Sequence, residues 1–186
     1  AHTSWLAVLV MTVMLAYSAL ALAMTLPHVA LIYQLFLPDK KSQIRSLSML
    51  LYTTLQVGFL FLAAGILCGA VWAHESCARR YWGWDPKETW SLITFFVYLA
   101  IIHARFAGWL RDFGLAAAAI LGFLSVIMTY YVVNFILASG LHSYGFAEGG
   151  QLYAYLFALF ELAVVAAAFA RHRLPVVVQV AGSEAG

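Results

Sequence analysis

The chain has 186 residues, of which 65% are hydrophobic and 10% are charged, and its formal net charge at pH 7 is +2. A soluble globular domain does not need so much apolar surface, so this composition predicts an integral membrane protein. The small net charge argues against a nucleic-acid-binding protein, because phosphate binding needs clustered lysines and arginines. The length allows one helical bundle, so we expect a single membrane domain over residues 1–186.

Five apolar segments are long enough to cross a bilayer, which takes about 20 helical residues. In chain order they cover about 4–26, 47–73, 88–104, 113–138 and 151–170, and the first helix has room to continue to residue 36. Pro27 is expected to kink this first helix or to mark its inner end. The predicted fold is therefore an all-α bundle of about five transmembrane helices.

Basic residues in the short loops predict the orientation of the bundle. They follow the first, third and fifth helices, at Lys40, Lys41, Arg45, Arg105, Arg111, Arg171 and Arg173. Because lysine and arginine favour the cytoplasmic side of a membrane, this face is expected to be the inner one. The N-terminus, the loop before residue 86 and the 139–150 loop then share the outer face. That face is periplasmic at a bacterial inner membrane, or lumenal at a thylakoid.

Residues 81–90 read Tyr-Trp-Gly-Trp-Asp-Pro-Lys-Glu-Thr-Trp, between two apolar segments. Asp85 is a favoured N-cap, Pro86 suits the first helical position, and Glu88 completes a capping box, so a helix should begin near residue 86. Since tryptophan is common at membrane interfaces, one interpretation is a well-capped helix with an aromatic belt. Capping does not require three tryptophans in this order, which favours an aromatic shelf for a planar ligand.

The string from Trp82 to Ile93 closely resembles the tryptophan-rich WWD signature of the haem-handling proteins of cytochrome c biogenesis, of the CcsA/ResC type (System II). Three further strings resemble the same family in the same order: residues 69–75, 101–105 and 140–145. The resemblance implies a WWD haem-handling core over about residues 46–146. Family members are commonly longer at the front, and this sequence starts without Met, so we expect a further N-terminal part before residue 1.

The resemblance implies an outer-face haem platform in which Trp82, Trp84 and Trp90 contact the porphyrin and Asp85 fixes the helix start. The cofactor would be haem b, held non-covalently because the chain has no Cys-x-x-Cys-His string. His142, in the outer loop, is the expected axial ligand, since imidazole commonly ligates haem iron; the alternative is a solvated loop histidine.

A second axial ligand on the outer face is left open. Aligning Ala16-Tyr-Ser-Ala-Leu20 with the family's Gly-Tyr-Ala-Ala-Leu places Leu9 where the resemblance implies a histidine. His2 or His74 could replace that ligand, or the ligand is lost.

Further titratable residues are expected inside the membrane, where they are costly and usually functional. The resemblance assigns His103 to an inner haem site; the alternative is a neutral histidine hydrogen-bonded between helices. His28 could pair with His103 or serve structurally, and Glu161 should be protonated or paired.

By resemblance, the function is to bind and transport haem and to present it on the outer face for covalent attachment to the CxxCH motif of apocytochrome c. A CcsB/ResB-type membrane partner is implied, and whether the chain forms part of a haem lyase stays open. Two alternatives remain: a haem-binding electron-transfer subunit of a larger membrane complex, and a haem-free structural subunit that keeps the same fold.

Overall fold

The computed structural model describes residues 2–75, 80–137 and 151–183, with side chains described from residue 5 to 133 and from 152 to 173 within those ranges. The helices, in order, are α1 (His2–Phe36), α2 (Lys41–Ala73), α3 (Pro86–Phe106), α4 (Asp112–Ile127), the π-helix η2 (Met128–Leu137) and α5 (Gln151–Ser183). Five helical stretches, with α4 and η2 forming one of them, are long and apolar enough to span a membrane. The prediction of an all-α membrane bundle is confirmed.

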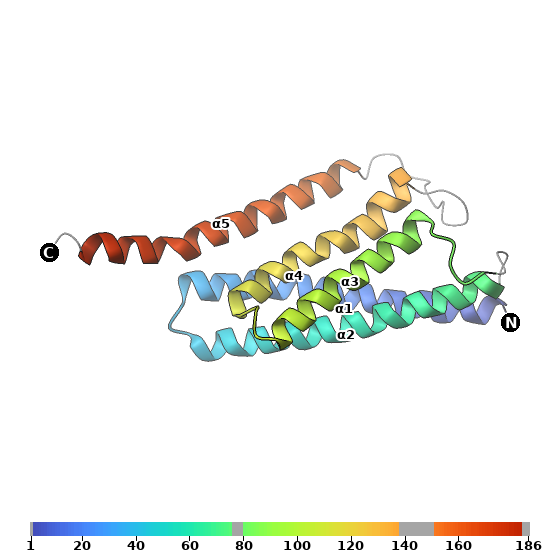
Figure 1. Cartoon of the computed structure of the whole chain (residues 1–186), viewed down its shortest axis with the longest axis horizontal. Coiled ribbons are helices and arrows are strands. Elements are labelled where there is room, and N and C mark those ends of the chain that lie inside the picture. Colours follow the sequence, from blue (N-terminus) through green and yellow to red (C-terminus); the bar gives the residue numbers. More distant parts are fainter. Residues whose placement is uncertain (1, 76–79, 138–150, 184–186) are drawn as a thin grey trace.

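Successive helices run in opposite directions, so the start of α1, the end of α2, the start of α3 and the end of η2 lie together (Figure 1). We call this the Trp end, because it carries Trp82 and Trp84. The arrangement follows from short connections between long apolar helices, which leave each helix little choice but to return beside its predecessor.

Pro27 does not end α1, which continues for nine residues beyond it to Phe36. A proline inside a helix has no N–H to donate to the preceding turn. Here the ring is among the most buried side chains of the chain. Packing against neighbouring helices therefore keeps this residue inside the helix rather than at its end.

The core is built where α1 packs on α2 and α4. Its fully buried side chains include Leu20, Leu55, Leu115 and Ile120. Small residues let the helix backbones approach: a Cβ placed on Gly122 would lie 2.8 Å from Ile101 Cδ1, which links α4 closely to α3. Such small-residue contacts are the usual way in which transmembrane helices pack, because lipid leaves no hydrophobic driving force between them.

The opposite end of the bundle is closed by a short turn between α3 and α4. Gly108 has φ +77° and so adopts the left-handed conformation that follows many helices. The Arg105 guanidinium donates to the Leu110 carbonyl at 2.9 Å and to the Asp112 carboxylate at 3.0 Å. The predicted cluster of basic residues at this end therefore includes at least one arginine that also ties the turn together.

α5 lies along one side of the bundle and extends beyond it (Figure 1). Its inward face repeats every three or four residues, as expected for a helix packed along one stripe. The buried members of this stripe are Glu161, Val165 and Ala168. A carboxyl side chain thus occupies the packed stripe of α5, beside apolar residues.

Candidate functional site

The loop before α3 forms the cap that its sequence predicts. Asp85 is the N-cap residue, its carboxylate accepts the Glu88 N–H at 2.8 Å, and Pro86 stands at the first helical position. The Glu88 carboxylate reaches back past the cap residue and accepts from the Gly83 N–H at 2.6 Å. The two acidic residues therefore hold both the helix start and the Trp-Gly-Trp backbone that precedes it.

Trp82 and Trp84 are placed in opposite environments by this loop. Trp84 has a φ of 59°, a strained left-handed conformation for a bulky residue, and its side chain is 70% exposed. Trp82 turns inward, and its indole Nε1 is buried without a hydrogen-bond partner among the residues that the structure describes. The rings meet edge to face with centroids 5.9 Å apart. The two tryptophans thus do not form one flat surface.

A cavity of about 360 Å³ lies at the Trp end, between α1, α2, the start of α3 and η2. Its walls are mostly aliphatic and aromatic, and Trp82 faces it together with Tyr81, Tyr17 and Tyr130. The charged residues that line it are Lys87 and Glu88. A largely apolar cleft of this size with a few polar groups is typical of a small-molecule site.

The cavity forms because α1 and α2 separate towards the Trp end. A Cβ placed on Gly58 would lie 2.6 Å from Leu20 Cδ2, and one on Gly65 would lie 2.9 Å from Val13 Cγ2. At Gly69 the nearest atom, Leu9 Cδ1, is 3.6 Å away, which is an ordinary contact. Leu9 therefore lines the cavity, at the position where the family resemblance implies a histidine.

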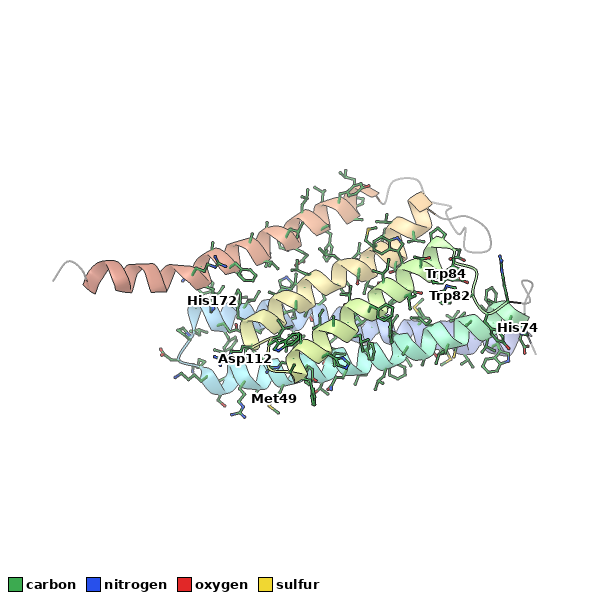
Figure 2. All side chains as sticks on the ribbon, in the orientation of Figure 1. Met49, His74, Trp82, Trp84, Asp112 and His172 are labelled. Carbon is green, nitrogen blue, oxygen red and sulfur yellow. The ribbon has the colours of Figure 1, made fainter. Side chains whose placement is uncertain are left out.

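Two of the predicted outer histidines, His2 and His74, belong to helix ends at the Trp end. His74 follows the last residue of α2, and its ring stacks parallel on Tyr81 with centroids 4.2 Å apart. Figure 2 shows it at the same end of the bundle as Trp82 and Trp84. His2 begins α1 at this end, although its side chain is outside the described set, and His142 lies outside the described residues altogether.

His103 lies in the last turn of α3, far from the Trp loop at the helix start. Its ring is exposed on the bundle surface, and Nδ1 hydrogen-bonds to the Leu99 carbonyl at 2.8 Å. Because a carbonyl only accepts, Nδ1 carries the hydrogen, and Nε2 is then the nitrogen with the lone pair that a metal needs. His28 is engaged elsewhere: its Nε2 lies 3.0 Å from the Glu161 carboxylate.

Trp90 contributes its backbone to a buried hydroxyl cluster that the sequence did not reveal. The Thr129 hydroxyl lies 3.1 Å from the Trp90 carbonyl and 2.8 Å from the Thr94 hydroxyl, which itself donates to the Ser125 carbonyl at 3.0 Å. Thr129 is the second residue of η2, and π-helical turns are often found at functional sites. The sequence places Thr94 one helical turn after Trp90, but it could not indicate that Thr129 of η2 contacts both residues.

Comparison with known proteins places the chain in a family. The family described as "Cytochrome C assembly protein" matches residues 1–142. The protein called "Cytochrome c biogenesis protein CcsA" from Gloeobacter violaceus is 50% identical over 105 residues, which are 56% of this chain and 30% of that protein. Its namesake from Heterosigma akashiwo is 48% identical over 109 residues, 58% of this chain and 33% of that protein.

A third protein of that name, from Chlorella vulgaris, is 47% identical over 95 residues, covering 51% of this chain and 30% of its own length. The matched part of the chain thus spans about a third of the length of these curated relatives. The family match includes α1 to η2 and ends before α5. The chain belongs to the cytochrome c assembly protein family, and within it to the CcsA type.

Proposed function

We propose that this chain binds haem in the cavity at the Trp end and presents it for covalent attachment to apocytochrome c. The observation that carries the proposal is the cavity of about 360 Å³ at the Trp end, which is largely apolar and is lined by Trp82, Tyr81, Lys87 and Glu88. Trp82 also has a buried indole Nε1 without a hydrogen-bond partner in the described part of the chain. An unpaired buried donor costs about 1–3 kcal/mol, so a ligand acceptor that reaches this nitrogen would be favoured.

The chemistry of the lining fits a porphyrin, which has wide apolar faces and two carboxylates at one edge. Aliphatic side chains of α1 and α2 together with Trp82 and Tyr81 would contact the faces. Lys87 lines the cavity, and Arg80 lies beside Gly83, with its guanidinium about 3.7 Å from a Cβ placed there. These two cations are suited to the propionates. Asp85 would support the site by fixing the start of α3, and Trp84 and Trp90 would add further contacts to the porphyrin.

The iron would take His142 as one axial ligand, from the loop that connects η2 with α5. His2 and His74 are the two candidates for the other, since both belong to helix ends at the Trp end. His103 would serve an inner haem site near the opposite end, for which its Nε2 lone pair is suited. The proposed axial pair would therefore combine residues that are far apart in the sequence.

For orientation, we propose that the Trp end faces the periplasm or the thylakoid lumen. Five basic residues, Lys40, Lys41, Arg45, Arg105 and Arg111, lie at the other end, which the positive-inside tendency assigns to the cytoplasm or stroma. The basic residues beside the Trp loop, Arg79, Arg80 and Lys87, are offset there by Glu75, Asp85 and Glu88. Haem delivered outward would there meet the CxxCH motif of apocytochrome c. The chain would work with a CcsB/ResB-type membrane partner, as part of a haem lyase that forms the thioether bonds.

The test is the visible spectrum of the purified protein, oxidised and reduced, for wild type and His142→Ala, together with the yield of mature c-type cytochrome in cells. The proposal expects a haem spectrum in the wild type, altered or lost in the variant, and a matching loss of mature cytochrome. Permanent haem without any effect on cytochrome maturation would instead favour a resident electron carrier. A wild type without haem, purified with its partners, would contradict both and favour a structural subunit.

A further inference from the structure

His28 of α1 and Glu161 of α5 form a pair near the middle of the membrane-spanning part of α5. His28 Nε2 lies 3.0 Å from Glu161 Oε2, and His28 Nδ1 lies 2.9 Å from the Met24 carbonyl oxygen. The Glu161 side chain is 3% exposed and that of His28 is 29% exposed. Both ring nitrogens are therefore engaged, one within α1 and one between α1 and α5.

Taken as hydrogen bonds, these two contacts indicate how many protons the pair holds. A carbonyl oxygen only accepts, so the hydrogen in the contact to Met24 belongs to Nδ1. A neutral ring protonated at Nδ1 has a lone pair at Nε2, and an ionised carboxylate has only lone pairs. A contact of 3.0 Å between Nε2 and Oε2 therefore needs a further proton, which resides either on the carboxyl group or on the ring. In either arrangement the pair as a whole is neutral, which suits its buried position.

Among the described residues, His28 and Glu161 form an ion pair or side-chain hydrogen bond with each other and with no further charged side chain. α1 contains no Asp, Glu, Lys or Arg, and its other titratable side chains in the described range are Tyr17 and Tyr33. On α4 the charged residue is Asp112, at its first position, where Arg105 pairs with it. The charged side chains of α2 are Lys41 and Arg45, near its start, and η2 offers Tyr130 and Tyr131.

On α5 itself, the basic residues Arg171, His172 and Arg173 lie about three turns beyond Glu161. Arg173 is exposed, and the other two have contacts of their own. The Arg171 guanidinium lies 4.2 Å from the centre of the Phe36 ring, and the His172 ring stacks on Phe113 at 4.2 Å. Tyr153 and Tyr155 are exposed near the start of α5. The proton shared with His28 is thus the local means of balancing the charge of Glu161.

The pair also matters for how α5 is attached. α5 lies beyond the residues matched by the family, and its packed stripe is otherwise aliphatic and aromatic. Aliphatic contacts in a bilayer do not fix the rotation or height of a helix, because lipid tails offer equivalent contacts. A hydrogen bond inside the membrane does fix them, since its geometry has one optimum.

We propose that His28 and Glu161 form a one-proton site inside the bundle, and that the bound proton fastens α5 to α1. Removing the proton leaves a carboxylate facing a nitrogen lone pair, a repulsive arrangement that α5 relieves by moving away. The site belongs to the chain itself and does not depend on haem, so it stands or falls separately from the function proposed above.

The proton is tested by infrared and ¹⁵N-histidine magnetic resonance spectra of the haem-free protein in lipid, near neutral pH. Spectra of Glu161→Gln and His28→Gln assign the two groups by difference. A protonated carboxyl group beside a ring protonated at Nδ1, or a carboxylate beside a doubly protonated ring, supports the site. A carboxylate beside a singly protonated ring overturns it.

The fastening is tested with spin labels at Val29 and Leu162, exposed neighbours of the two residues, in a variant without Cys68 and Cys77. In Glu161→Gln the amide N–H can donate to Nε2, so the distance distribution should stay as narrow as in the wild type. Glu161→Leu, which keeps the volume but not the hydrogen bond, should broaden it or shift it to longer distances. An unchanged distribution in Glu161→Leu overturns the fastening role.

Discussion

The interface between α1 and α2 is closed near its middle and open at the Trp end, and the two halves differ in what they can do. At Gly58 the neighbouring Leu20 leaves no room for a methyl group, whereas at Gly69 Leu9 stands at an ordinary contact distance. In the closed half, α1 and α2 pack directly against each other. The open half ends in a cavity lined by Trp82, whose buried indole Nε1 has no hydrogen-bond partner in the described part of the chain. Close packing in one half thus holds the helices while their separation in the other leaves room for a ligand.

The largest effect should come from adding a methyl group to the closed half. We expect Gly58→Ala to destabilise the protein by about 1–3 kcal/mol, because its Cβ would meet Leu20 at 2.6 Å and push α1 and α2 apart. Gly69→Ala is the matched control and should change stability little, since its Cβ has 3.6 Å to Leu9. Unfolding in detergent micelles compares the two, and equal losses would refute the difference between the halves.

An intermediate effect is expected at Trp82 in the open half, where the indole Nε1 has no hydrogen-bond partner among the described residues. Trp82→Phe keeps an aromatic ring but removes the indole N–H, so haem affinity should fall about tenfold. Trp109→Phe is the control, because Trp109 is 82% exposed in the turn between α3 and α4 at the opposite end. Haem titration of the two purified variants measures this; equal affinities would mean that the indole N–H of Trp82 does not bond to the ligand.

A smaller gain is expected from adding an imidazole to the open half. Leu9→His places a ligating side chain on the cavity wall, so we expect haem content to rise roughly threefold, with a shift towards a low-spin spectrum. The gain is limited because burying a polar ring costs free energy. Leu15→His, on the exposed side of the same helix, is the control. If both variants have the wild-type spectrum, Leu9 is not placed to reach the iron.

The sequence was sufficient for features that depend on local pattern. Apolar length predicted the five helices, and Asp85, Pro86 and Glu88 predicted the start of α3 correctly. Features that depend on how helices align were not accessible. The partner of Glu161 was left open because 133 residues separate it from His28 in the sequence. The helix register that joins Thr129 to Trp90 was equally hidden.

The backbone conformation of the Trp-Gly-Trp segment could not be predicted from the sequence either. A flat aromatic shelf was a reasonable expectation for Trp-Gly-Trp, but the left-handed Trp84 turns its ring outward while Trp82 lines the cavity. Gly83, which would tolerate such a conformation, precedes the residue that adopts it. A composition-based argument cannot assign a positive φ to a tryptophan, because that residue type rarely adopts one.

The most direct test of the central claim, that haem occupies the cavity at the Trp end, is to fill the cavity without touching any histidine or charged group. Ala70→Trp adds a large ring to the cavity wall, and Leu67→Trp adds the same ring to the exposed side of α2, where Leu67 is 68% exposed. The haem content of the two purified proteins should differ, with Ala70→Trp folded but depleted of haem and Leu67→Trp at the wild-type level. Full haem content and an unchanged spectrum in folded Ala70→Trp would contradict the claim.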